Sequence, residues 1–496
     1  MKKRLLISVI CIILALSATL VAFAACDKVP TTKVSTYAEL LNAEGNVVLT
    51  DDIDCNFGVV STLNFDSFDG QDHKIKNFII KATGVTDNAA FFSADTQSIK
   101  NVTFEGVKAE GINVLALSIV KIGGGGKIEN VHVKSAEIKV TQNDKLPCFV
   151  GAIYAGAYNE HVGKTSEVYE SPDANLMGCS VDNVTIKVEG TTSTTKIRHD
   201  VNVGAIAGVC DNVSNSYATN CNLTVNSNST ASGVIVGGLV GISDGSIVNS
   251  YSANNTLNVN AIGIDYSTGY TEANLCVGGL VGYMYYNHFY HITYDLEKEL
   301  SSSKIQCCYA EQNTITARTN GKINAGGLAG HLWGTQVGQC YAVNNEITDG
   351  NVGFLSYNVW SYENMARSLC GLVGYAERAL ITSSFTCNNV ISESSEPYYD
   401  CVIAACGLSI VDDATSVSYC ATYNNTLTAD CTDEFSCLPI ANAYYCLVTS
   451  QASGNVNACQ IVNSSFWSNA NSLKKQLKIG GLYWTFAPNK LPTLEF

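Results

Sequence analysis

A phrase in two halves recurs along most of this chain. Its first half reads VGGLVG at positions 236–241 and returns, with small changes, at 203–208, 277–282, 325–330 and 369–374. Its second half reads NSYSANNTL at 249–257 and returns at 215–223, 307–315, 339–347, 383–391 and 419–427. A single short repeat cannot bury a hydrophobic face alone, so such repeats stack on their neighbours and share one continuous core.

Apolar and polar side chains alternate inside each unit, as at 185–188 and 222–225. A period of two is typical of β-strands, and glycine and asparagine turns separate the strands of one unit. The whole chain has only 7 prolines in 496 residues, so few ladders are interrupted. We therefore predict an all-β protein: a parallel β-helix of about ten or eleven coils between residues 40 and 470, with terminal caps.

One aligned position holds asparagine in nearly every unit. Asparagine tolerates the left-handed backbone that a sharp corner requires, and stacked amides can bond to one another along the solenoid axis. We predict a structural ladder rather than a binding site from this column, which comprises Asn183, Asn220, Asn254, Asn344, Asn388, Asn424 and Asn469, with Gln312 in the only gap.

The glycine-rich phrase followed by Asn-Ser-Tyr resembles the GLUG motif, which forms tandem repeats in bacterial surface proteins and in regions of immunoglobulin A metallopeptidases. The resemblance covers residues 87–469. It implies a right-handed parallel β-helix on a cell surface. It does not imply proteolysis, because the zinc-binding pattern His-Glu-x-x-His is absent from the chain.

The segments on either side of the repeats lack the phrase. Residues 36–86 are expected to form the N-terminal cap and first coil, with a short helix at 37–42 that covers the open edge of that coil. Residues 470–496, which include Trp484, are expected to form a C-terminal cap that closes the other end. Terminal units of solenoids usually depart from the repeat in this way.

The first 25 residues read as an export signal. Lys2 to Arg4 form a basic start, an apolar run follows at 5–23, and Ala24 and Ala25 precede Cys26. Small residues before cysteine resemble the bacterial lipobox, which implies a lipid on Cys26, a tether at 26–35 and attachment to the outer face of a membrane. An ordinary cleaved signal and an uncleaved anchor are the alternatives, since Phe23 departs from the usual leucine and the run is long enough to span a bilayer.

The composition and net charge of the chain limit the kinds of molecule that it can bind. Hydrophobic residues make up 46% of the chain and charged residues 15%, so the chain can bury a core, while its net charge of −15 disfavours nucleic acid or anionic lipid bound by charge alone. We expect no nucleic-acid partner.

Without Cys11 and Cys26, 18 of the 20 cysteines remain. Several alternate with serine in one aligned column, which favours small, buried, reduced side chains. If disulfides form instead, neighbouring coils make Cys308–Cys340 and Cys370–Cys406 the best candidates. The chain has no Cys-x-x-Cys pair, so we expect no metal bound by cysteine.

No set of residues forms a convincing catalytic site, and we expect no cofactor or metal. His288, His291 and Asp295 lie in an insertion, where an aromatic exposed loop is favoured over a metal site. Asp51, Asp52 and Asp54 suit either calcium or a turn that protects the first edge, and the turn is favoured. Asp412 and Asp413 are adjacent acids within the repeats and are expected in a solvated turn.

Two long insertions replace short connections after the glycine-rich phrase, between Ala155 and Met177 and between Gly282 and Gln306. Both are expected to leave the same corner of the coil, three coils apart. Aromatic side chains with polar tips suit sugar rings or protein surfaces. We weigh one composite binding surface against loops that bury their own rings; the candidate residues are Tyr154, Tyr158, His161, Tyr169, Tyr283, Tyr285, Tyr286, His288 and Tyr290. A third insertion, between Asp349 and Arg367, leaves another corner.

These observations predict an exported, non-enzymatic lipoprotein. Its β-helix would display loops for adhesion to a glycan, a host protein or a neighbouring surface polymer. One alternative is a polysaccharide lyase or glycoside hydrolase of the β-helix type, in which Asp412 and Asp413 would be the first residues to test. The other is a structural spacer without a soluble ligand.

Overall fold

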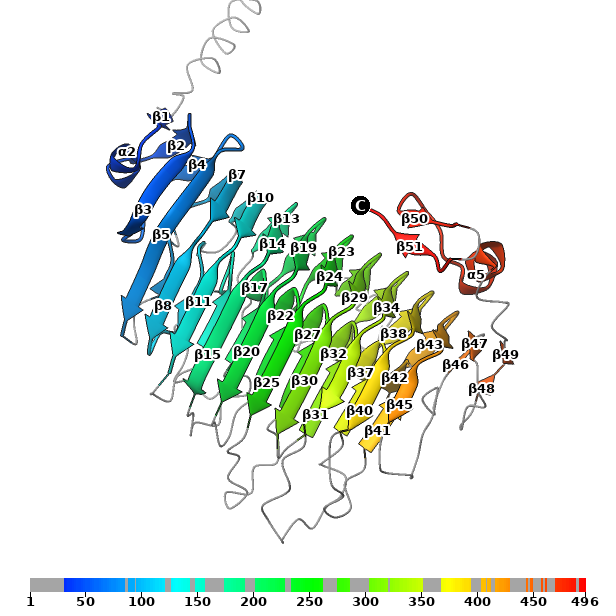
Figure 1. Ribbon diagram of the computed structural model, residues 1–496. Helices are drawn as coiled ribbons and strands as arrows, with labels where there is room; N and C mark the ends of the chain where they lie inside the picture. Colours follow the sequence, from blue (N-terminus) through cyan, green and yellow to red (C-terminus); the bar gives the residue numbers. More distant parts are fainter. Residues whose placement is uncertain are drawn as a thin grey trace, which may run out of the picture.

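The structure is a computed structural model. It describes residues 31–84, 88–93, 95–120, 126–142, 148–156, 174–191, 201–227, 233–261, 274–285, 303–319, 322–350, 367–393, 403–406, 408–411, 415–428, 443–444, 447–448, 456–457, 460–461, 469–487 and 490–496. These residues wind into a parallel β-helix, with successive coils side by side along one axis (Figure 1). The predicted fold class is confirmed.

Each central coil contributes five strands to three parallel sheets. In one coil, β16 (Val201–Gly204) belongs to a 9-stranded sheet, β17 (Ala207–Cys210) to a 6-stranded sheet, and β18 (Asn212–Ser214), β19 (Tyr217–Thr219) and β20 (Asn222–Ser227) to a 34-stranded sheet. The next coil repeats this order with β21 (Val234–Gly237), β22 (Val240–Ser243), β23 (Ser246–Val248), β24 (Tyr251–Ala253) and β25 (Thr256–Ala261). Equivalent residues pair in register, as Leu223 does with Leu257.

In each coil, the first strand that belongs to the large sheet pairs with the equivalent strand of the next coil. This column of strands runs from β2 (Asn46–Leu49) to β46 (Ala443–Tyr444). This takes eleven successive parallel pairings, one per turn. A twelfth pairing, with β48 (Val456–Asn457), continues the same column, so the described strands make about one turn more than the expected ten or eleven.

The large sheet bends twice in each coil, and each bend is made by one residue with left-handed backbone. Asn215, with φ 50°, separates β18 from β19, and Asn220, with φ 56°, separates β19 from β20. Such a backbone costs most L-residues about 1–2 kcal/mol, but asparagine adopts it readily. Asparagine holds the second corner in most coils, whereas at the first corner Cys307, Gln339, Ser383 and Tyr419 take the same left-handed backbone in later coils.

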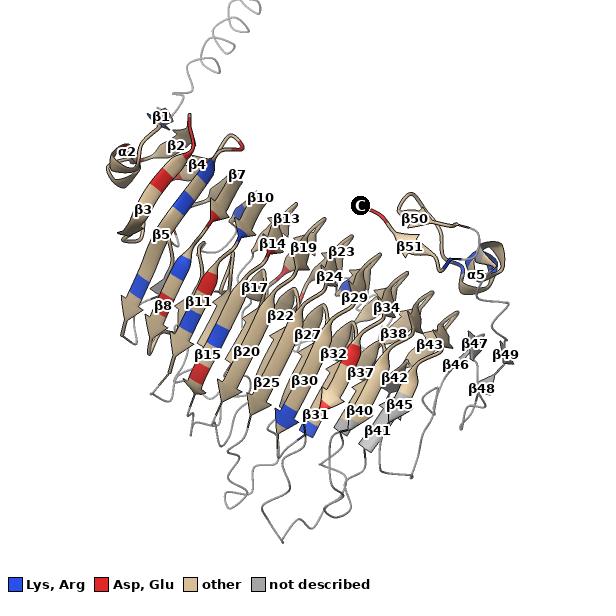
Figure 2. Cartoon of the chain, in the orientation of Figure 1, with Lys and Arg blue, Asp and Glu red and all other residues tan. Residues whose placement is uncertain are grey.

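Branched aliphatic side chains fill the interior. Leu223 and Val225 of β20 and Leu257 and Val259 of β25 are all fully buried. The first coils use phenylalanine instead: the rings of Phe78 and Phe91 lie 4.6 Å apart, and Phe92 and Phe104 join the same group. Charged side chains are concentrated on the strands of these first coils (Figure 2).

A short helix covers the first coil, as expected. Helix α2 (Tyr37–Leu41) begins at Thr36, whose side chain accepts a hydrogen bond from the Glu39 N–H, while Glu39 bonds back to the backbone of Thr36. This reciprocal pair is a capping box. Leu40 is fully buried against the coil, and α2 contacts β3 (Ile53–Val59).

The C-terminal segment, residues 469–496, does not close the far end of the solenoid, so that expectation was wrong. Its helix α5 (Ala470–Leu477) and its antiparallel pair β50 (Trp484–Thr485) and β51 (Thr493–Leu494) lie against the outside of the coils (Figure 1). Trp484 Nε1 donates to Gln339 Oε1 at 3.1 Å, and the Lys478 ammonium lies 3.6 Å from the centroid of the Tyr419 ring.

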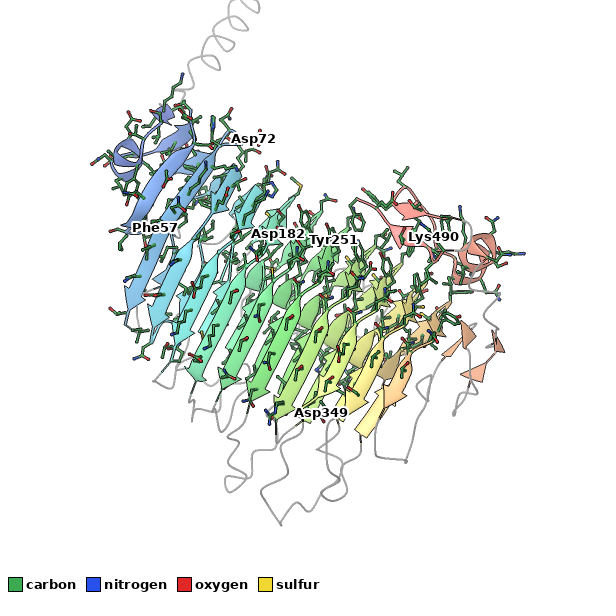
Figure 3. The ribbon with its side chains drawn as sticks, viewed as in Figure 1. Phe57, Asp72, Asp182, Tyr251, Asp349 and Lys490 are labelled. Carbon is green, nitrogen blue, oxygen red and sulfur yellow. The ribbon has the colours of Figure 1, made fainter. Side chains whose placement is uncertain are left out.

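The C-terminal segment packs against the outside of the coils because the large sheet carries a row of aromatic side chains there. Five consecutive coils place aromatic rings directly above one another, and neighbouring ring centroids are 4.7–5.2 Å apart. We call these residues the tyrosine row: Tyr217, Tyr251, Tyr309, Tyr341 and Phe385. Tyr251 is labelled in Figure 3. Trp484 packs on Tyr341 and Phe385, so the C-terminal segment removes an outward apolar surface from water.

Candidate functional site

The two long insertions leave the same corner of the coil. The first begins after Tyr154, which bridges to Ala207 of β17, and ends before β13 (Asn175–Met177). The second runs between β27 (Val281–Tyr285) and β28 (Lys304–Gln306), which are the equivalents of β17 and β18 two coils later and therefore lie three coils after Tyr154 and β13. Three rungs correspond to about 14 Å along the axis.

Most of the expected loop residues lie outside the described residues: Tyr158, His161, Tyr169, Tyr286, His288 and Tyr290. The same holds for Cys26, His291, Asp295, Asp412 and Asp413. The candidate residues that the structure describes are Tyr154, Tyr283 and Tyr285.

Tyr154 is not a surface residue, and its assignment to the binding loop was wrong. Its side chain is fully buried in the main core, among the largest side chains that the coils enclose. Its backbone bridges Val120 on one side and Ala207 on the other. Burial also raises the pKa of its phenol well above the usual value. Tyr154 therefore belongs to the ladder, and the insertion begins after it.

Tyr283 and Tyr285 do lie on the outside, and they belong to a larger group. Their rings are 5.5 Å apart on β27. Tyr283 lies 4.9 Å from the ring of His331 on β32 (Ala329–Trp333), which lies 5.2 Å from Tyr375 on β37 (Val373–Glu377). We call Tyr283, Tyr285, His331, Trp333 and Tyr375 the aromatic cluster.

Register explains why these rings meet. Tyr283 pairs with His331 and His331 with Tyr375, while Tyr285 pairs with Trp333. A Cβ at Gly282 would lie 2.6 Å from Ile235 Cγ2, so only glycine lets β27 approach the strands behind it. The glycine-rich phrase therefore fixes the strands so that the side chain directly after its last glycine points outward in each coil.

All five side chains of the aromatic cluster are half-buried. The Lys322 ammonium lies 5.1 Å from the centroid of the Tyr375 ring, a cation–π contact at one side of the cluster. Such a surface combines apolar ring area with the polar tips of tyrosine, histidine and tryptophan. It suits contact with sugar rings or with a protein.

Sequence reasoning missed His331, Trp333 and Tyr375. A signal was present, because HLW comes after AGGLAG and YAE after LCGLVG at the same offset at which YMY comes after VGGLVG. Aligning the three residues directly after each copy of the phrase would have placed these side chains in two outward columns, one through Tyr283, His331 and Tyr375 and one through Tyr285 and Trp333.

The asparagine column lies at the second corner of each coil. Asn183, Asn220, Asn254, Asn344, Asn388 and Asn424 all have positive φ, as does Gln312. Asn424 Nδ2 donates to Asn388 Oδ1 at 2.8 Å, one of the amide contacts expected along the axis. Asn469 does not belong to this ladder, because it has φ −104° and its side chain caps helix α5 by accepting from the Ser472 N–H.

A second asparagine ladder, which sequence reasoning missed, lies inside the coils. It begins directly after the corner and comprises Asn255, Asn313, Asn345, Asn389 and Asn425. Asn313 Oδ1 accepts from the Asn255 N–H at 3.0 Å, and Asn345 Oδ1 accepts from the Asn313 N–H at 3.0 Å. These amides satisfy backbone groups that the corner would otherwise leave unpaired in the core.

The cysteine and serine column has the same role at the first corner. The Cys179 N–H donates to Ser216 Oγ at 3.0 Å, and the Cys308 N–H donates to Cys340 Sγ at 3.4 Å. Hydroxyl and thiol both accept here, which explains their alternation. Cys308, Cys340 and Cys370 are free thiols.

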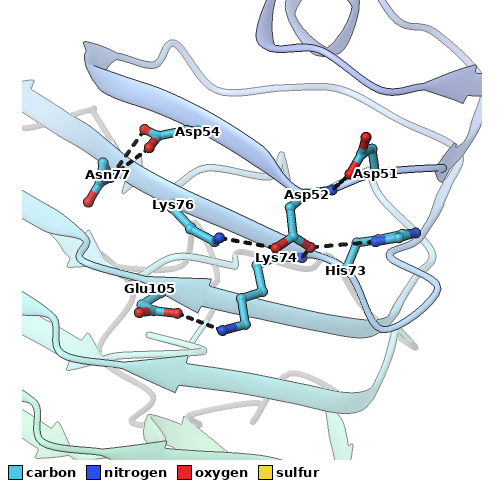
Figure 4. Close-up of polar contacts among 8 residues, drawn as sticks. All are labelled: Asp51, Asp52, Asp54, His73, Lys74, Lys76, Asn77 and Glu105. Atoms are coloured by element: carbon cyan, nitrogen blue, oxygen red, sulfur yellow. Dashed lines mark hydrogen bonds and ion pairs between the residues drawn. The ribbon is translucent and has the colours of Figure 1, made fainter.

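The acidic group in the first coil is held by its own neighbours (Figure 4). Asp52 lies 3.0 Å from the Lys76 ammonium and 3.5 Å from His73 Nδ1, while Asp54 accepts from Asn77 Nδ2 at 3.1 Å. The backbone N–H of Lys74 and the Lys76 ammonium lower the pKa of the Asp52 carboxyl. Among the residues that the structure describes, no group of three His, Cys, Asp or Glu side chains is placed to hold a metal ion.

Comparisons with known proteins give no relative: no protein-family model, curated protein or solved structure matches the chain. The resemblance to GLUG repeats thus stays a prediction from the motif. Within the described part of the chain, no helix has the length and apolar character needed to cross a membrane.

Proposed function

We propose that this protein is an exported, lipid-anchored surface protein that binds a glycan or a surface protein without catalysing a reaction. The aromatic cluster supports this proposal most strongly. It places half-buried rings from three consecutive coils on one rigid sheet, at the base of the insertion that begins after Tyr285. Rings fixed in this way lose little conformational entropy when a ligand covers them.

The corner that both insertions share supports a composite surface. If the loops at 157–173 and 286–302 form it together with the cluster, replacing either loop by the short turn at 242–246 should weaken binding and leave the β-helix folded. The coil that contains β22 and β23 already closes with that turn. Unfolding of both variants would show that the loops are packing elements.

The experiment is a screen of the mature chain without its lipidated cysteine, residues 27–496, on a glycan array and on immobilised host-matrix proteins. For any ligand found, Tyr285→Ala and Tyr375→Ala should each weaken binding by about 1–3 kcal/mol, the range for rings buried in an interface. Tyr483→Ala is the matched control, since Tyr483 is partly exposed on the C-terminal segment, outside the cluster. Blank screens with folded protein, or equal losses for all three variants, would contradict the proposal.

The anchor needs its own test, because it rests on the Ala-Ala-Cys sequence before residue 27. Cys26→Ser should abolish metabolic labelling with a fatty acid and release the protein from the membrane fraction. Labelling that persists in this variant would rule out lipidation at Cys26.

A further inference from the structure

Each central coil contributes three strands to the large sheet, and the outward side chains of the third strand change from charged to neutral along the solenoid. In the early coils this strand carries ion pairs: Lys81 on β5 (Lys74–Thr83) lies 3.8 Å from Glu110 on β8 (Lys108–Ile112), and Lys187 lies 2.7 Å from Glu189 on β15 (Thr185–Thr191). From β20 onward the outward side chains are mainly amides and hydroxyls. Figure 2 shows this boundary: β5, β8, β11 and β15 carry coloured bands, whereas β20 and β25 are tan.

A central line of neutral polar side chains crosses five consecutive coils of this surface. It runs over β20, β25, β30 (Thr314–Thr319), β35 (Glu346–Asp349) and β40 (Val390–Glu393), and its residues are paired in register: Thr224, Asn258, Thr316, Thr348 and Ser392. We call this line, with the outward amides and hydroxyls beside it on β20 and β25, the neutral face.

The neutral face is accessible and has hydrogen-bonding capacity to spare. Asn258 is exposed, and Thr224 and Thr316 are half-exposed. Thr348 Oγ1 and Ser392 Oγ share a hydrogen bond of 2.9 Å, whereas the side chains of Asn258 and Thr316 make none with other residues that the structure describes. An array that alternates amide and hydroxyl offers both donors and acceptors in every rung.

We infer that the neutral face binds an extended, uncharged polysaccharide chain laid along the solenoid axis. The face repeats a polar group about every 4.8 Å, so a chain of repeating hydroxyl-bearing rings meets an equivalent set of partners at each step. Its central line has no charge to attract an ionic polymer, and the net charge of −15 opposes a polyanion. Lys187 and Glu189 on β15 lie one rung before the face, whereas Arg318 on β30 and Glu346 on β35 flank its central line within the five coils.

A protein strand is a poorer occupant. Adding a strand requires a free sheet edge, but β25 is paired with β20 on one side and β30 on the other. The inference concerns the 34-stranded sheet, whereas the aromatic cluster lies on the 6-stranded sheet, so it does not depend on the proposed ligand of that cluster.

Each rung should contribute little, because a side chain that bonds a sugar hydroxyl first gives up bonds to water. Affinity should therefore grow with the number of rungs that one chain covers, as in other multivalent contacts. Short oligosaccharides should bind weakly, and a chain that spans the five rungs of the central line should bind best.

The test is affinity electrophoresis of the mature chain in gels that contain a neutral mixed-linkage β-glucan, galactomannan or xylan, with polygalacturonate as the acidic polymer. We expect retardation by at least one neutral polymer and none by polygalacturonate. Asn258→Glu and Thr316→Glu should each lower the apparent affinity about tenfold, because each removes a neutral partner and adds a carboxylate that must be desolvated. Asn258→Thr should bind like the original chain.

Lys139→Glu is the matched control, since Lys139 occupies the same position of the coil on the charged strand β11 (Glu137–Thr141) and should leave retardation unchanged. No retardation by any neutral polymer, or full retardation of both Glu variants, would overturn the inference. If Tyr285→Ala abolishes retardation and Asn258→Glu does not, the polymer binds the aromatic cluster; the inference is then wrong and the proposed function stands.

Discussion

The side-chain oxygen of Asn389 accepts two hydrogen bonds from Asn345 in the preceding coil, one from its backbone N–H at 2.8 Å and one from its Nδ2 at 3.0 Å. Asn389 Nδ2 in turn donates to the Ala342 carbonyl at 3.0 Å. Both asparagines are buried. One side chain thus satisfies the backbone groups of Ala342 and Asn345, before and after the corner at Asn344, which lets a sharp corner exist inside an apolar core.

Asn389→Ala should therefore destabilise the protein more than loss of an exposed amide. The change leaves the Asn345 N–H without its acceptor in a buried site, which should lower the free energy of unfolding by about 1–3 kcal/mol. Asn226→Ala, at an outward position of β20, is the control and should change it by less than about 0.5 kcal/mol. Urea unfolding followed by circular dichroism measures both, and equal losses would refute a special role for the inner ladder.

The corner itself can be tested at Asn254, which has φ 57°. Asn254→Ala should lower the free energy of unfolding by about 1–2 kcal/mol, because alanine pays the steric cost of left-handed backbone. Asn254→Gly should cost less than Asn254→Ala, since glycine has no Cβ. If thermal melts rank the glycine variant below the alanine variant, backbone conformation does not explain this column.

Deleting residues 469–496 should leave the coils folded and uncover the tyrosine row. Trp484, Leu473 and Leu477 bury one side of the cluster that contains Tyr341 and Phe385, so their loss exposes a contiguous aromatic surface. We expect unchanged β-sheet circular dichroism, stronger binding of the dye ANS and self-association seen by light scattering. Loss of the β-sheet signal would instead show that the segment is needed for the coils to fold.

The sequence predicted the coils well because the repeat constrains every rung in the same way. Alternation identified the strands, and the asparagine column identified the second corner of each coil. Asn469 was misplaced because a short similarity to the repeat at 464–469 outweighed a local signal: an asparagine before a helical stretch is also a good N-cap.

The positions of Tyr154 and of the C-terminal segment depend on tertiary contacts, which local sequence patterns do not predict. Tyr154 was assigned to a loop because an insertion begins close behind it, although its backbone still belongs to the ladder. The C-terminal segment carries no repeat, so nothing local indicated where it packs. The outward aromatic column from Tyr217 to Phe385 was visible in the repeats, and its need for cover could have indicated the place.

Alkaline pH should weaken the fold through its buried thiols. Burial raises the pKa of Cys148 and Cys179 from 9.0 to about 12, so the folded chain holds these protons more tightly than the unfolded chain does. Their contribution to stability is fully present below pH 9 and is lost as the pH rises from 9 toward 12. Cys179→Ser removes one of these two titrating thiols. Serine fits this position, because Ser216 occupies the same column in the next coil. The Tm of this variant should fall less steeply over this window, and identical slopes would contradict the assignment.

Tyr154→Ala and Tyr285→Ala should differ in stability, because Tyr154 lies in the core and Tyr285 lies on the surface. Tyr154 is fully buried, so removing its ring leaves a cavity between coils and should lower the free energy of unfolding by about 3–5 kcal/mol, the range for large aromatic residues in cores. Tyr285 is half-buried on the outside of β27, and its removal should cost clearly less. Tyr154→Phe keeps the ring and should stay close to the original chain. Thermal unfolding of the three variants decides the matter: a Tyr154→Ala variant as stable as Tyr285→Ala would place Tyr154 back among the surface residues.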